Sequence, residues 1–226
     1  MTRGEKICAF IEHYCLIPEG AQVGQPIKLM KFQRKFILDV FDNPHGTSRA
    51  YLSVARKNGK SALIAAILLA HLVGPEARQN SQIISGARSR DQASLVFKLA
   101  EKMVRLSPEL SKIVRIVPSQ KMLVGLICNV EFKAISAESG TAHGLSPVLA
   151  ILDEVGQVRG PHDAFIEAIE TALIDVMNAT HKQMRRRMLL CRTSWPFAHF
   201  SYTWKYQNKC RATDCSGAIT ATLLSG

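Results

Sequence analysis

Residues that could act on a nucleotide phosphate lie in two short segments of this 226-residue chain. Ser53–Ser61 reads SVARKNGKS, an apolar run that ends in Gly-Lys-Ser, and Val148–Glu154 reads VLAILDE, an apolar run that ends in Asp-Glu. The first pattern predicts a strand that leads into a phosphate-binding loop, and the second predicts a buried strand with acids at its end. Nucleotide hydrolysis needs both, because the loop binds the phosphates while the acids serve a magnesium ion and the attacking water.

Each of these positions has an expected task. Gly59 lets the backbone approach the phosphates closely, at a helix N-terminus whose N–H groups bind anions. Lys60 would neutralise the β- and γ-phosphates, and the Ser61 hydroxyl would bind magnesium. Asp153 would also hold magnesium, usually through a water, and Glu154 would orient and polarise the attacking water.

Two further segments could assist such a site. Gln33 follows Phe32 on an expected helix, and its side-chain amide can both donate to and accept from the edge of an adenine base. His143, followed by Gly-Leu shortly before the second strand, is a candidate for a phosphate-sensing or hinge residue.

Regular elements must bring these residues together. The apolar periodicity predicts helices over residues 3–16, 31–41, 60–72, 92–106 and 164–173, and strands over 49–54, 81–85, 122–127, 129–135 and 148–152, with the third and fourth strands forming a hairpin insertion. Strands that alternate with helices over residues 48–173 indicate a parallel, three-layer α/β sheet. Such sheets bind ligands at the carboxyl ends of their strands, where the loop and the Asp-Glu pair would both lie.

Composition sets wider limits. The chain is 47% hydrophobic and 21% charged, as expected for a cored protein, and it has no apolar run of membrane-spanning length. The N-terminal segment carries charges within a helical pattern, unlike a signal peptide, so we expect an intracellular protein whose six cysteines are free thiols. The net charge of +11 suits a polyanionic partner.

The last 53 residues differ from the rest. Residues 174–226 hold eight Lys or Arg, two Asp and no Glu, whereas residues 1–173 hold eleven Glu, and both tryptophans fall in the last segment. These residues either bind DNA through phosphate contacts and stacking, or were never selected for any fold. We therefore divide the chain into a helical segment with the adenine-contact motif (1–47), a nucleotide-binding core (48–173) and an atypical basic tail (174–226) that is disordered or frame-disrupted.

Four ordered segments resemble the N-terminal ATPase half of phage terminase large subunits: KFQRKFI (31–37), SVARKNGKS (53–61), ISAESGTAHGLSP (135–147) and VLAILDE (148–154). The similarity covers roughly residues 5–173 and is to the group whose phosphate loop lacks its first glycine, here Val54. The resemblance implies a P-loop NTPase fold of the ASCE/RecA-like type, with a mostly parallel sheet flanked by helices and incomplete at its C-terminal side.

The resemblance also implies ATP and Mg²⁺ as cofactors and a role for each site residue. The adenine contact would be Gln33, the magnesium acid Asp153 and the catalytic acid Glu154, and the phosphate loop would comprise Arg56, Lys57, Asn58, Gly59, Lys60 and Ser61.

The implied function is an ATP-driven motor that packages double-stranded viral DNA into a procapsid in the host cytoplasm, as a ring of large subunits on the portal with a small terminase subunit. Family members also carry a nuclease and a Ser/Thr-rich coupling motif that we do not find here, so we expect a truncated chain with a reading-frame disruption near residue 174. Two alternatives remain: another nucleic-acid translocase ATPase, and a catalytically silent remnant that binds nucleic acid or procapsid.

Overall fold

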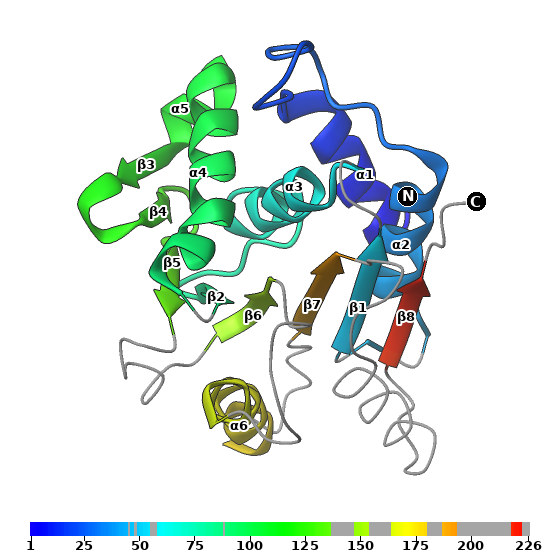
Figure 1. Ribbon diagram of the computed structural model, residues 1–226, viewed down its shortest axis with the longest axis vertical. Helices are drawn as coiled ribbons and strands as arrows, with labels where there is room; N and C mark the ends of the chain where they lie inside the picture. Colours follow the sequence, from blue (N-terminus) through cyan, green and yellow to red (C-terminus); the bar gives the residue numbers. More distant parts are fainter. Residues whose placement is uncertain are drawn as a thin grey trace.

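The computed structural model describes residues 1–44, 46–47, 49–54, 58–87, 89–136, 147–153, 164–179, 187–193 and 218–222. Helices and strands alternate along most of this length (Figure 1). The elements are α1 (Arg3–Tyr14), α2 (Lys31–Phe41), β1 (Arg49–Val54), α3 (Lys60–Leu72), β2 (Gln82–Ala87), α4 (Arg90–Leu106), α5 (Pro108–Ile113), β3 (Val114–Val117), a 3₁₀ turn (Pro118–Gln120), β4 (Met122–Gly125), β5 (Val130–Ser136), β6 (Pro147–Leu152), α6 (Ala164–Ala179), β7 (Arg187–Thr193) and β8 (Ala218–Thr222).

All the described strands belong to one sheet, in the order β3-β4-β5-β2-β6-β7-β1-β8. The pairs from β5 to β8 are parallel, and β3, β4 and β5 pair antiparallel. Strand β7 lies between β6 and β1, parallel to both, so β1 and β6 end at the same edge of the sheet. The expected common edge for the loop and the acids is thus confirmed.

Helices cover both faces of the sheet (Figure 1). Helices α1, α2, α3 and α4 share the larger apolar core with one face, and α3 is buried along nearly its whole length. Helix α6 packs on the opposite face, in a smaller core with side chains of β1, β2, β5 and β6. This arrangement confirms the predicted α/β class with its mostly parallel, helix-flanked sheet.

The expected bounds of α2, β1 and α3 agree with the structure, whereas other elements differ. Strand β5 pairs with β2 as well as β4, so the predicted hairpin is part of the main sheet. Helix α6 continues to Ala179, six residues beyond its expected end. The sequence analysis assigned no element to α5, β3, β7 or β8, whose short apolar runs carry no distinguishing period. The division at residues 47 and 173 stays a prediction.

Cys8, Cys15 and Cys128 are free thiols, which confirms the expectation for the cysteines in the described part of the chain. Burial raises the pKa of Cys15 to about 12, so that thiol stays protonated at neutral pH. No helix within the described ranges is long and apolar enough to cross a membrane.

Candidate nucleotide site

The site begins at the turn between β1 and α3. Gly59 is the N-cap of α3 and has a φ of 70° and a ψ of 16°, a left-handed conformation that costs glycine little. Its carbonyl accepts the first helical hydrogen bond, from the Leu63 N–H at 2.9 Å. The helix therefore starts at Lys60, with the half-buried Ser61 next to it in the first turn. Free N–H groups at such a helix start favour an anion.

Lys60 and Asp153 meet across the sheet edge. Lys60 Nζ donates to Asp153 Oδ1 at 2.7 Å, and the two side chains are only 9% and 8% exposed. Asp153 directly follows β6, and its N–H donates to the Gly86 carbonyl at the end of β2, at 3.3 Å. The two predicted motifs thus converge on one buried ion pair, although their charged residues stand 93 positions apart.

Gln33 lies against the same loop. Its Nε2 donates weakly to the Asn58 carbonyl at 3.5 Å, and a Cβ added to Gly59 would lie 3.3 Å from that Nε2. Its Oε1 accepts from the Met30 N–H at 3.0 Å, which caps the start of α2. Gln33 is buried at 6% exposure, so it is held between α2 and the loop rather than displayed on a solvent-facing helix.

The structure therefore brings together Gln33, Asn58, Gly59, Lys60 and Asp153, with Ser61 adjacent. Arg56, Lys57, His143 and Glu154 lie outside the described residues.

One participant escaped the sequence analysis. Gly86 supplies the carbonyl that receives the Asp153 N–H. A glycine inside the apolar run IISGA was the available signal, because glycine within a strand often marks a close backbone approach.

The donor set at this edge fits a magnesium ion. The Ser61 hydroxyl and the Asp153 carboxylate offer oxygen atoms, the ligand type that Mg²⁺ prefers. Within the described ranges, no group of three or more His, Cys, Asp or Glu side chains gathers as a dedicated metal cage. Magnesium in phosphate chemistry uses one or two protein ligands and keeps water and phosphate as the others, so the residues present suffice.

The model of the terminase large subunit ATPase domain matches residues 31–182 of this chain. The terminase large subunit of Enterobacteria phage HK97 is 67% identical over 172 residues, which is 76% of this chain and 34% of that protein. The chain thus spans about a third of the length of that curated relative.

Solved structures agree in fold. The crystal structure of the HK97 large terminase superposes with a TM-score of 0.86 and 52% identity over 98% of this chain and 44% of that one. The ATPase domain of the Thermus phage P74-26 large terminase gives 0.55 and 22% over 80% and 68%. The large terminase of another thermophilic bacteriophage, in complex with ADP, gives 0.56 and 11% over 86% and 45%. The last two show similarity of fold alone.

Proposed function

The chain belongs to the family of terminase large-subunit ATPase domains, and on that premise we propose that its site binds and hydrolyses ATP with magnesium. The single observation that carries this proposal is the buried Lys60–Asp153 ion pair at the end of β6, beside the N-terminus of α3. It unites a phosphate-binding cation and a metal-binding acid, which hydrolysis requires in one place.

Each side chain has a task in this proposal. The α3 N-terminus and Lys60 bind the phosphates, and Gln33 reads the adenine edge from α2. On ATP binding, Lys60 exchanges its Asp153 partner for phosphate oxygens, and the freed carboxylate joins the Ser61 hydroxyl as a metal ligand. Magnesium, when bound, supplies neutralisation of the charge that develops on the transferred phosphoryl group. Glu154 orients the attacking water and accepts its proton.

Steady-state ATP hydrolysis by Glu154→Gln tests this assignment. We expect turnover to fall about 10²–10⁴-fold while ATP binding persists, because the amide keeps the shape of the acid and cannot take a proton. Glu131→Gln, the same change at an exposed position of β5, is the matched control and should behave as wild type. Wild-type turnover by Glu154→Gln would remove Glu154 from the mechanism, and absence of ATP binding by the unmodified chain would contradict the proposed function itself.

Gln33→Ala should weaken ATP binding about 2- to 10-fold, since a hydrogen bond contributes about 0.5–1.5 kcal/mol. Binding of ATP and GTP is measured side by side, together with thermal unfolding. Loss of the adenine contact reduces the preference for ATP over GTP. Equal weakening of both nucleotides would assign Gln33 to capping α2 and supporting the loop, without base recognition.

We propose that the whole protein to which this chain corresponds packages double-stranded DNA into a procapsid. In this proposal it acts as a ring of large subunits with a portal and a small terminase subunit. Family membership and the net charge of +11 support this role.

A reading-frame disruption near residue 174 also stays our proposal. Identity to HK97 terminase is 67% over 76% of the chain but 52% where the structural comparison spans 98%, so the added part contributes few identical residues. Sequencing of the locus tests it: the idea fails if no other downstream frame encodes the missing nuclease acids.

A further inference from the structure

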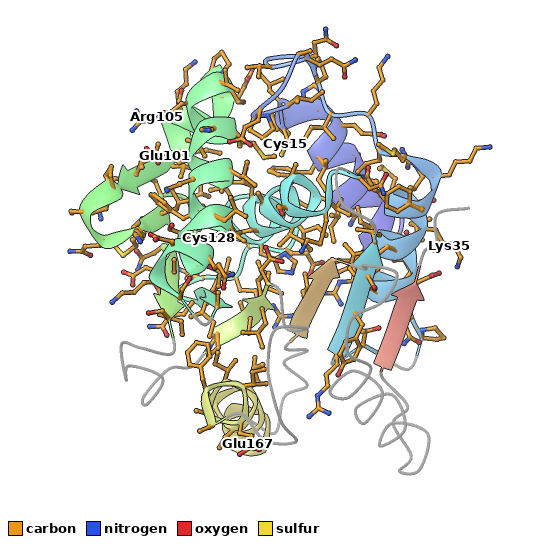
Figure 2. The ribbon with its side chains drawn as sticks, viewed as in Figure 1. Cys15, Lys35, Glu101, Arg105, Cys128 and Glu167 are labelled. Carbon is orange, nitrogen blue, oxygen red and sulfur yellow. The ribbon has the colours of Figure 1, made fainter. Side chains whose placement is uncertain are left out.

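Helix α6 packs on the face of the sheet opposite the nucleotide site. Its inward side chains Ile166, Ile169 and Leu173 join a core cluster that includes Ile84 of β2 and Leu152 of β6. Glu167 lies on the outer side of the helix (Figure 2). The helix is therefore docked by one apolar stripe onto the strands that end at the site.

Gly86 is the point of closest approach between β2, β6 and α6. A Cβ added there would lie 2.8 Å from Leu152 Cδ2 and 3.0 Å from Phe165 Cε1. Real Cβ contacts are longer than this, and Leu152 is 2% exposed, so neither neighbour has free space into which it can move. Only glycine fits between the Leu152 and Phe165 side chains without displacing one of them.

The same contact leads directly to Asp153. Gly86 pairs with Leu152 in the parallel register of β2 and β6, and its carbonyl receives the Asp153 N–H. Successive residues of an extended chain point to opposite faces. Leu152 accordingly packs in the α6 core, while the next residue, Asp153, reaches Lys60 at the start of α3.

We propose that Gly86 and Phe165 form a positioning contact that sets the place of Asp153 relative to Lys60. The inference rests on the proposed function, because it concerns the metal-binding acid of that site. Volume added at Gly86 pushes on Leu152, moves the Leu152–Asp153 peptide and separates the ion pair on the other face. The segment that carries Glu154 joins Asp153 to α6 along the chain, so the contact also sets both ends of that segment.

Gly86→Ala tests the contact by crowding it. We expect Mg²⁺-dependent turnover to fall about 10- to 100-fold, as displacements of about 1 Å at a reacting centre do. The Mg²⁺ concentration for half-maximal turnover should rise, whereas ATP binding without Mg²⁺ should change less than about twofold, within the range of a surface substitution. In the nucleotide-free chain, amide exchange at Asp153, followed by NMR, should accelerate.

Phe165→Leu removes the ring atoms that a Cβ at Gly86 would meet, so the double variant should recover turnover and slow exchange compared with Gly86→Ala alone. Ile169→Ala, fully buried in the same cluster one turn further along α6, is the control: it should lower stability and leave the Mg²⁺ requirement unchanged.

Three outcomes overturn the inference: wild-type turnover and exchange in Gly86→Ala, absence of rescue in the double variant, or an equal rise in Mg²⁺ requirement for Ile169→Ala. If Gly86→Ala does not fold, Phe165→Leu alone carries the exchange measurement, and unchanged exchange at Asp153 then overturns the inference. Absence of ATP binding by the unmodified chain contradicts the proposed function instead, and exchange at Asp153 still tests the contact.

Discussion

Lys60→Met is expected to abolish ATP turnover and to destabilise the chain even without nucleotide. Turnover should fall at least about 10²–10³-fold, the usual cost of removing one charge-stabilising donor from a reacting site. The stability effect comes from Asp153, which is 8% exposed and would keep a buried charge without its Lys60 partner. Breaking a buried ion pair from one side costs about 3–5 kcal/mol. Urea unfolding and binding of a fluorescent ATP analogue measure the two effects separately.

The double variant Lys60→Met, Asp153→Leu distinguishes these roles. Replacing both members of a buried pair by apolar side chains is often neutral or stabilising, so the unfolding free energy should return toward wild type while ATP binding stays absent. Lys35→Met, which removes an exposed lysine that pairs with Asp39 on α2, is the matched control and should change stability by less than about 1 kcal/mol. Wild-type stability of Lys60→Met would show that the pair is not buried in solution.

Shortening the chain to residues 1–180 is the second change with a large expected effect. It removes β7, which lies between β6 and β1 and pairs with both along its length. Without it, β6 and β1 lose their only link through the sheet among the described strands, and each exposes an unpaired edge that favours aggregation. We expect no cooperative unfolding transition and little soluble protein.

A chain of residues 1–193 is the control, since it keeps β7 and loses the edge strand β8, which leaves the order from β3 to β1 intact. It should unfold cooperatively. Leu189→Ala within β7 gives a point test in the full chain: the side chain is 1% exposed, and its truncation should cost about 2–5 kcal/mol. Equal solubility and stability of the 1–180 and 1–193 chains would contradict the central position of β7 and favour a tail that contributes nothing to the fold.

Local signals accounted for the elements that the sequence predicted well. Strand β1 is a short apolar run, Gly59 stands where a left-handed turn is needed, and α3 is a long run of strong helix formers, so each bound has a cause within a few residues. The elements that were missed lack such causes. Strand β7 follows Arg185 and Arg186 in a segment without a clear period, and it is a strand because its neighbours satisfy its backbone on both sides.

The sequence by itself determined the chemistry that this chain can offer: a glycine, a lysine and a hydroxyl after one strand, two acids after another, and an amide upstream of both. Residue type and local order decide such properties, because the charge and hydrogen-bonding capacity of a side chain do not depend on its distant neighbours. Only the tertiary structure decided that Lys60 and Asp153 meet in a buried ion pair, that Gln33 rests on Gly59, and that Gly86 supports the acid from behind. The reason is that strand order and helix docking follow from contacts between residues far apart in the chain, and similar apolar strands leave several such orders open until the whole core is packed.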